Sequence, residues 1–233
     1  MMANVNFKSR FLYLYIIIAT FELLFDSGVI ELDVLRYLTK PSLVIFLALF
    51  VLDNLTLKES KSLLFTCLFA WLGDIFLMFS HPIFFPLGLL SFLVMQILYI
   101  RNFAMNLKFN QINRMLDGVV GILFLGYVFF FLNLLWSGVG GELKIPVILY
   151  GISLGSMAFF AFLRKSYDTS ISYKIVFLGA VFFVISDSLL AYNKFVSTFN
   201  GNSFYVMGTY ILAQLLLIVG LVNFVIRKRL NVQ

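Results

Sequence analysis

The chain has 233 residues, of which 62% are hydrophobic and 12% are charged, whereas about a quarter of the residues in a soluble domain are charged. This composition excludes an ordinary soluble globule and indicates an integral membrane protein. The net charge of +6 does not indicate nucleic-acid binding, because the basic residues stand singly or in small groups between apolar runs. Cys67 and His81 are each the sole residue of their type, which excludes an intramolecular disulfide and a zinc site built from several thiolates or imidazoles.

The predicted fold class is all-α, a polytopic membrane protein with about eight transmembrane helices. A span needs roughly 17 to 25 mainly apolar residues, and eight runs of the sequence satisfy this requirement. The predicted helices cover residues 9–26, 38–55, 61–80, 83–101, 117–136, 145–163, 172–193 and 203–226. The first run lacks a small-residue cleavage site and is predicted to be a retained span. No connector is long enough for a soluble domain, so residues 1–233 are predicted to form a single transmembrane domain.

The basic residues are distributed unevenly between the two predicted sides of the membrane. Thirteen of the 17 lie on the side of the two termini, and four lie on the other side: Arg36, Lys40, Lys144 and Lys194. Because positive residues concentrate on the cytoplasmic side, both termini are predicted to be cytoplasmic, and an even number of spans agrees with this. Short connectors favour a multi-pass protein of a bacterial inner membrane.

Three acidic residues lie inside predicted helices, where an ionisable side chain costs several kcal/mol and by default marks a functional site. They are Glu22, Asp74 and Asp187. A helical rise of 1.5 Å per residue places each of them roughly 15–23 Å from the cytoplasmic end, so they are predicted to share one layer. A purely structural role remains an alternative. It is weaker for the two aspartates, because each follows a small residue, Gly73 or Ser186, that leaves room beside it.

Other polar residues are predicted to approach this layer from the sixth and eighth helices: Tyr150, Tyr210 and Gln214. Lys40 is predicted to lie at the outer mouth of the second helix, with Pro41 at the start of that helix. Gln96 in the fourth helix is either an interhelical hydrogen-bonding residue or a site residue. By helical rise it lies about 20 Å from the outer end, and the prediction puts it about two turns deeper than the aspartates.

Several short motifs extend from the second to the eighth predicted helix. They are Lys40-Pro41, Gly73-Asp74 with Leu77, Gly88 with Tyr99, Gly179-Ala180 with Phe182, Ser186-Asp187 with Leu190-Ala191 and Phe195, and Tyr210 with Gln214 and Gly220. Together they resemble the YhhN family, and the SDxxLAxxxF element around Asp187 is the most specific of them. The chain departs from the pattern at Gln96, where many relatives are expected to have a histidine three residues before the tyrosine.

The resemblance implies the activity of the animal members of the family, which are lysoplasmalogenases. These enzymes hydrolyse the vinyl ether bond of a lysoplasmalogen to a fatty aldehyde and a glycerophospho-ethanolamine or -choline. The reaction needs a proton on the distal alkene carbon, which a protonated carboxyl can deliver while an ionised one stabilises the resulting cation. Asp187 is assigned as donor and Asp74 as stabiliser, although the roles could be swapped. The predicted substrate contacts are Lys40, Tyr150, Tyr210, Gln214, Glu22 and Gln96, and no metal or cofactor is required.

The predicted partners are a lysophospholipid substrate and the lipid bilayer, without nucleic acid, and assembly into a homo-oligomer is left open. Two other functional classes compete with the hydrolase. A small proton-coupled transporter also places carboxylates in the membrane, but its site usually lies in helices interrupted by glycine or proline, and the third and seventh predicted helices contain no proline. A non-enzymatic lipid-binding or assembly protein would not need matched acids. Release of free aldehyde from a lysoplasmalogen separates these classes.

Overall fold

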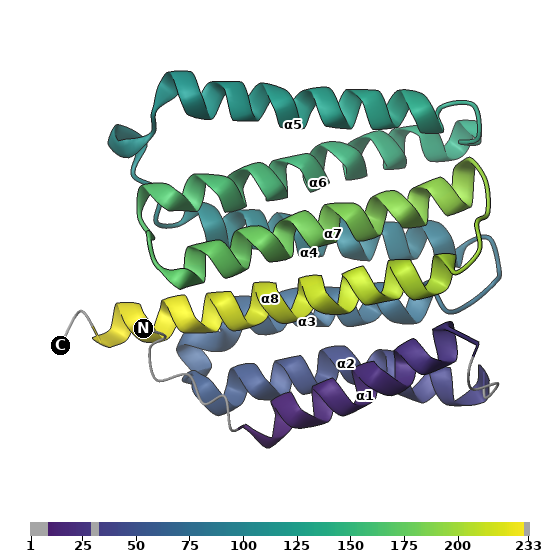
Figure 1. Cartoon of the computed structure of the whole chain (residues 1–233), viewed down its shortest axis with the longest axis horizontal. Coiled ribbons are helices and arrows are strands. Elements are labelled where there is room, and N and C mark those ends of the chain that lie inside the picture. Colours follow the sequence, from purple (N-terminus) through teal and green to yellow (C-terminus); the bar gives the residue numbers. More distant parts are fainter. Residues whose placement is uncertain (1–8, 29–32, 231–233) are drawn as a thin grey trace.

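The computed structural model describes residues 9–28 and 33–230, and within them every regular element is a helix (Figure 1). Short 3₁₀ segments lie in the connectors at Phe109–Gln111, Gly141–Leu143 and Arg164–Ser166. The α-helices of the described residues are α1 (Arg10–Asp26), α2 (Asp33–Asn54), α3 (Leu57–Phe76), α4 (Phe84–Ala104), α5 (Arg114–Leu135), α6 (Lys144–Leu163), α7 (Ile171–Phe195) and α8 (Asn202–Leu230). The predicted all-α class is therefore confirmed.

The helices run along one common axis, and α1 begins at the same end of the bundle at which α8 finishes (Figure 1). We call this the terminal end, and we call the end at which α1 and α7 finish the opposite end. α8 packs along α7 and also contacts α1 and α2, while α4 contacts both α3 and α6. α5 packs mainly on α6 and forms an edge of the bundle (Figure 1).

Six helices within the described residues, α2 and α4 to α8, are long and apolar enough to cross a membrane, judged by length and composition. α1 is slightly shorter, with 17 residues, and α3 opens on a charged turn. The outer face of α5 carries large apolar side chains, including Leu123, Phe129 and Phe130, each more than 60% exposed. Water would not tolerate such a continuous apolar surface, so the bundle has the exterior of an integral membrane protein.

Two helices, α2 and α3, differ most from their predicted bounds. α2 begins at Asp33 rather than at residue 38, so Pro41 lies inside the helix and not at its start. Proline removes one backbone donor, but transmembrane helices tolerate it because neighbouring groups satisfy the freed carbonyl. α3 begins at Leu57 and ends at Phe76, ahead of the predicted 61–80. The reason is a capping box, in which the backbone N–H and the hydroxyl of Thr56 both donate to Glu59 Oε2, at 3.0 and 2.6 Å.

Close packing and hydrogen bonds fix the rotation of α7 against α8. Ser172 Oγ donates to the carbonyl of Gly220 at 2.8 Å, and Ser186 Oγ donates to the carbonyl of Val206 at 2.9 Å. Between them, a Cβ added at Gly179 would lie 2.9 Å from a backbone nitrogen of α8. Such small residues let helices approach closely in a bilayer, where apolar burial alone gives little driving force. The rotation of α7 in turn determines the direction of Asp187.

A fully buried arginine, Arg164, joins the helices at the terminal end. Its Nη2 donates to Asp168 Oδ2 at 3.2 Å. Burial alone would raise the pKa of Asp168, but hydrogen bonds from Ser170 and the charge of Arg164 outweigh it, so this pKa lies below its ordinary value. The guanidinium carbon lies 5.0–5.7 Å from the ring centroids of three aromatic residues, Phe103, Tyr167 and Phe224.

The variant Asp168→Asn leaves the buried Arg164 without its ion-pair partner. We expect the free energy of unfolding to fall by about 3 kcal/mol, the scale seen when one member of a buried pair is removed. The contribution is complete above the ordinary pKa of an aspartate and is lost as the pH falls through the lowered pKa. The wild type should therefore have a higher midpoint of thermal unfolding in detergent at pH 7, and its advantage should shrink in acid.

Glu142→Gln is the matched control. Glu142 is exposed and has no ion pair among the residues that the structure describes, so its neutralisation should leave the midpoint unchanged. Equal midpoints for Asp168→Asn and the wild type at pH 7 would contradict a stabilising role for the Arg164–Asp168 pair.

Candidate functional site

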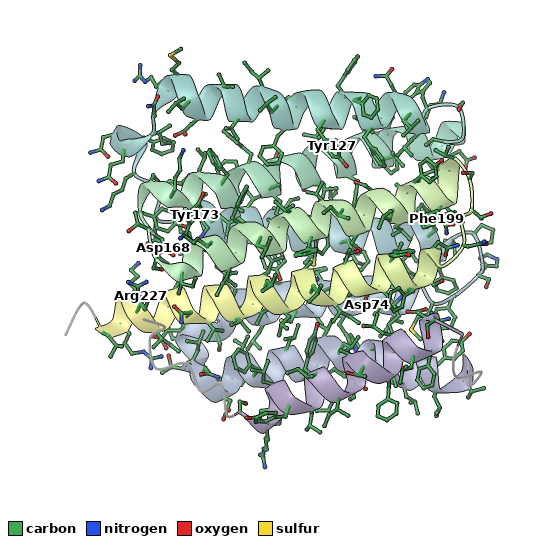
Figure 2. The ribbon with its side chains drawn as sticks, viewed as in Figure 1. Asp74, Tyr127, Asp168, Tyr173, Phe199 and Arg227 are labelled. Carbon is green, nitrogen blue, oxygen red and sulfur yellow. The ribbon has the colours of Figure 1, made fainter. Side chains whose placement is uncertain are left out.

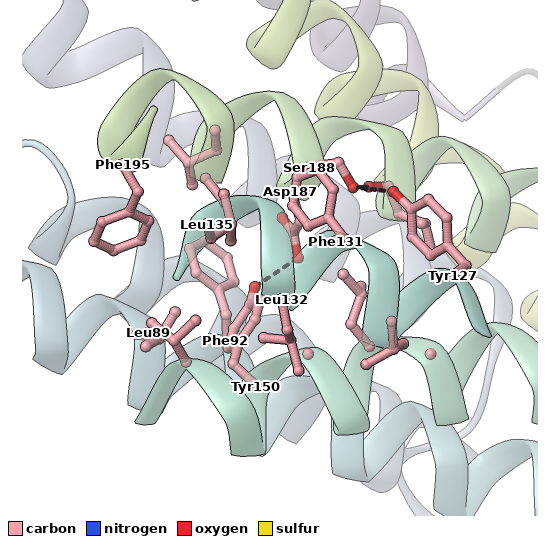
Figure 3. Close-up of a pocket in the computed structure, with 18 of the residues that line it drawn as sticks. Leu89, Phe92, Tyr127, Phe131, Leu132, Leu135, Tyr150, Asp187, Ser188 and Phe195 are labelled. Atoms are coloured by element: carbon pink, nitrogen blue, oxygen red, sulfur yellow. Dashed lines mark hydrogen bonds between the residues drawn. The ribbon is translucent and has the colours of Figure 1, made fainter. Parts of the chain in front are cut away.

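An apolar cavity of about 70 Å³ lies between α4, α5, α6 and α7 (Figure 3). It has room for a few water molecules or methylene groups. Its polar side chains come from α5, α6 and α7, and its remaining wall is aromatic and aliphatic. The labelled residues of Figure 3 that line it are Leu89, Phe92, Tyr127, Phe131, Leu132, Leu135, Tyr150, Asp187, Ser188 and Phe195.

Asp187 provides the carboxyl group of this cavity. Tyr150 on α6 donates its hydroxyl proton to Asp187 Oδ2 at 2.6 Å (Figure 3). Successive residues of a helix point about 100° apart, because one turn takes 3.6 residues. Ser186 therefore reaches α8, Asp187 reaches α6, and Ser188 reaches α5. Three adjacent residues of α7 thus form hydrogen bonds with three different neighbouring helices.

The structure corrects the predicted depth of Gln96. The amide Nε2 of Gln96 donates to Asp187 Oδ2 at 3.4 Å, so Gln96 lies beside the aspartate rather than about two turns deeper. The rise per residue located the Cα atoms but ignored the direction of the side chains. A helical side chain leans toward the N-terminus of its own helix, and α4 and α7 run in opposite directions. Their side chains therefore lean toward each other and close the axial gap.

A second polar pair on the cavity wall was not identified from the sequence. Ser188 Oγ donates to the carbonyl of Val184 at 2.6 Å, and it accepts the hydroxyl proton of Tyr127 at 2.6 Å (Figure 3). Ser188 directly follows Asp187, and Tyr127 is the sole hydroxyl-bearing residue of α5. The position of Tyr127 in the middle of a predicted span was the feature of the sequence that could have indicated this pair. The pair ties α5 to α7 across the cavity.

A wider cleft of about 560 Å³ at the opposite end, which we call the vestibule, adjoins the cavity. The two spaces share three wall residues, Leu77, Phe85 and Leu190. The vestibule is more polar than the cavity, and it is basic because Lys40 of α2 and Lys194 of α7 both line it. Lys40 was predicted at the mouth of the second helix, but it lies about two turns inside α2 and lines the vestibule there. Lys194 was not among the predicted site residues.

Asp74 belongs to a separate buried cluster and does not line the apolar cavity. It is 2% exposed, and Tyr210 of α8 donates to its Oδ2 at 2.8 Å. Phe92 stands between this cluster and the cavity. Its ring lines the cavity and packs edge-on against the Tyr210 ring, at 6.0 Å between centroids. A Cβ added at Gly73 would lie 2.8 Å from the same ring, so the small residue before Asp74 gives room to Phe92.

The remaining predicted contacts also lie outside the cavity wall. Gln214 accepts the hydroxyl proton of Tyr99 at 2.9 Å and donates to Met95 Sδ at 3.3 Å, which ties α8 to α4. Glu22 accepts a hydrogen bond from Thr39 and lies 3.9 Å from Arg36 Nε, which ties α1 to α2. Each of these side chains joins two helices rather than facing the cavity.

Asp187 therefore lies apart from the other two acids that the sequence placed in one layer, whereas Asp74 and Glu22 are close enough to interact electrostatically. Asp187 lies at the cavity with Tyr150 and Gln96, Asp74 lies with Tyr210 behind Phe92, and Glu22 lies near the opposite end with Arg36. Two residues at equal depth along the bundle axis can still lie far apart, because their helices occupy different positions in the cross-section of the bundle. Within the described ranges, no three His, Cys, Asp or Glu side chains gather closely enough to hold a metal ion.

Comparison with known proteins agrees with the motif resemblance. The YhhN family matches residues 35–221, which extend from α2 into α8 and include both aspartates. Comparisons with curated proteins and with solved structures return no match.

An apolar carboxyl reagent, dicyclohexylcarbodiimide, should distinguish the two aspartates in membranes. We expect modification of Asp187 ahead of Asp74, because the carboxyl of Asp187 faces the cavity whereas Asp74 lies behind Phe92. The measurement is the time course of the mass shift in peptides that contain each residue. Asp187→Asn removes the reactive carboxyl and should abolish the early labelling. Faster modification of Asp74 would show that the reagent reaches the cluster that the geometry closes off.

Proposed function

The chain belongs to the YhhN family, and from this premise we propose that it is a membrane-embedded lipid hydrolase that cleaves the vinyl ether bond of lysoplasmalogens. The family is associated with hydrolase activity. The observation that carries the proposal is the carboxyl of Asp187, hydrogen-bonded by Tyr150 on the wall of an apolar cavity that adjoins a basic vestibule. An acid in this position meets the substrate where its apolar chain joins its polar glycerol.

The polarity of the two connected spaces supports a lysophospholipid as the substrate. The phosphate would lie in the vestibule near Lys40 and Lys194, and the hydrocarbon chain would extend from the apolar cavity toward the lipid side of α5. A vinyl ether lies between these two parts of a lysoplasmalogen, next to the glycerol. Its alkene would then lie near the junction of the spaces, within reach of Asp187. Tyr127 and Ser188 would bound the chain on the far side of the carboxyl.

In the proposed reaction, the carboxyl of Asp187 gives its proton to the alkene carbon that is distal to the ether oxygen. The other alkene carbon becomes an oxocarbenium ion, stabilised by the carboxylate just formed. Water adds to this carbon, and its lost proton returns to Asp187. The hemiacetal then collapses to the fatty aldehyde and the glycerophospho-alcohol. Tyr150 and Gln96 orient the carboxyl through their hydrogen bonds to Oδ2.

Asp74 is proposed to support the site from behind Phe92. It is linked to the cavity wall through Tyr210 and Phe92, and Lys40 is close enough to interact with it electrostatically. Its role in this scheme is to position Phe92 and Lys40, while Asp187 performs the proton transfer. Gln96 is compatible with the scheme, because the proton comes from a carboxyl and no imidazole is needed.

For topology, we propose eight spans in a single domain with both termini in the cytoplasm, in a bacterial inner membrane. The support is the bias of thirteen basic residues against four, together with the shared end at which α1 begins and α8 finishes (Figure 1). In this orientation the terminal end faces the cytoplasm. The vestibule, with Lys40 and Lys194, faces the other side.

Reporter fusions test this orientation. A reporter fused after Gln233 should be active in the cytoplasm, and one inserted at residues 138–141 should report the other side of the membrane. The physical reason is the retention of basic loops on the cytoplasmic side. Export of the C-terminal fusion would show that the span count or the orientation is wrong.

A product assay tests the chemistry. Purified protein in detergent is incubated with a lysoplasmalogen, and free aldehyde is measured over time. Asp187→Asn keeps the size of the side chain but removes its transferable proton, so we expect kcat to fall at least about a hundredfold, the scale of a lost acid–base group. Asp74→Asn should lower kcat less than Asp187→Asn does, because it keeps an acceptor for Tyr210 and does not line the cavity.

The control is a lysophospholipid with a saturated ether in place of the vinyl ether, which cannot form the oxocarbenium ion by protonation and should yield no aldehyde. Both variants should insert and purify as the wild type does. If folded wild-type protein releases no aldehyde, a vinyl ether is not its substrate. Normal turnover of Asp187→Asn would show that another group donates the proton.

A further inference from the structure

A cleft of about 910 Å³ lies at the terminal end, away from the proposed reaction site. It is bounded by α3, α4 and the last turns of α8, the end of the bundle that Figure 2 marks with Arg227. Its floor is apolar, with Leu63, Leu221 and Val225, and Phe65 at its edge is 46% exposed. The cleft therefore has an apolar surface that continues to the outside of the bundle, unlike a polar connector between helices.

The rim of this cleft is strongly basic. One acid, Glu59, stands against five cations from three helices: Lys58, Lys61, Arg101, Lys228 and Arg229. Arg229 Nε donates to Glu59 Oε1 at 3.0 Å, and Lys228 Nζ donates to Asn106 Oδ1 at 2.8 Å. The other three cations have no acceptor among the residues that the structure describes.

The bias of basic residues toward one side of the membrane explains why cations occur at this end, but not why they gather around one cleft. Arg114 and Lys174 lie at the same end and are also exposed. They line neither this cleft nor the apolar cavity. By contrast, Lys61 of α3 and Arg101 of α4 both border the cleft above its apolar floor. A basic pocket between transmembrane helices is the arrangement that binds lipid head groups.

We propose that this cleft binds an anionic glycerophospholipid. The phosphate lies among Lys58, Lys61 and Arg101, and the acyl chains extend past Phe65 along the outer face of α3. A lipid in this position bridges α3, α4 and α8, two of which, α3 and α8, are also linked by the Glu59–Arg229 ion pair. The lipid thereby stabilises the terminal end of the bundle. This site is independent of the proposed hydrolase activity, since it shares no residue with the cavity or the vestibule.

The test measures lipid binding by the delipidated, detergent-purified chain. Phosphatidylglycerol and phosphatidylcholine are titrated separately, the midpoint of thermal unfolding is recorded, and native mass spectrometry counts the bound lipid. Phosphatidylglycerol should raise the midpoint well above the effect of phosphatidylcholine. In the variant Lys61→Gln/Arg101→Gln, the apparent affinity for phosphatidylglycerol should fall at least about tenfold, since each basic residue near a lipid surface contributes to binding.

The matched control is Arg114→Gln/Lys174→Gln, which removes the same two residue types from the same end and should bind phosphatidylglycerol as the wild type does. Equal losses of affinity in both double variants would show that the lipid is attracted by the basic surface as a whole, which would overturn the proposed site. An unchanged affinity in Lys61→Gln/Arg101→Gln would overturn it as well. Equal stabilisation by soluble glycerophosphoglycerol would show that the cleft takes the free phosphodiester and does not require a lipid.

Discussion

The rotation of α7 about its own axis is the constraint on which the proposed site depends. Ser172 and Ser186 bind backbone carbonyls of α8, and Gly179 brings the two helices into contact. With α7 held in this way, Asp187 must point toward α4 and α6, where Gln96 and Tyr150 meet it. A rotation by one residue, about 100°, would bring Ser186 or Ser188 to that position instead and remove the carboxyl from the cavity.

The same requirement explains two further pairs of buried polar residues between helices. In a bilayer, a buried polar group that lacks a partner costs several kcal/mol, so polar side chains on different helices meet in pairs. Tyr210 with Asp74 and Tyr99 with Gln214 join α8 to α3 and α4. These pairs hold the helices in register. A polar residue in a predicted span therefore indicates either a contact between helices or a reacting group, and depth alone does not distinguish the two.

Charge divides the bundle into two basic ends with different neighbours. At the opposite end, Lys40 and Lys194 line a vestibule that adjoins the apolar cavity, which suits a single-chain lipid that enters with its phosphate outside. At the terminal end, Lys61 and Arg101 border a cleft whose floor leads onto the lipid-facing surface. Substrate and structural lipid would thus be recognised by the same chemistry, a phosphate on cations beside an apolar wall, at sites that share no residue.

Most of the helical architecture follows from the sequence, because apolar runs of the length of a bilayer core can satisfy their backbone groups only as helices. The errors at the starts of α2 and α3 came from polar positions. Thr56 and Glu59 start α3 ahead of its apolar run through a capping box, and Pro41 lies within α2 where hydropathy alone put a helix start. Neither effect changes the number of helices, since both act on the ends of apolar runs.

The sequence by itself determined which side chains carry the candidate chemistry, since ionisable residues in apolar runs are few and costly. It placed Asp74 and Asp187 in the interior with Tyr150 in a similar layer, and it placed Gln96 about two turns deeper. Only the tertiary structure decided that Asp187, Tyr150 and Gln96 meet while Asp74 lies behind Phe92. The physical reason is that the rise per residue gives the position of a residue only along the axis of its own helix. Contact across the bundle depends on the rotation and spacing of separate helices, which small residues such as Gly73 and Gly179 set.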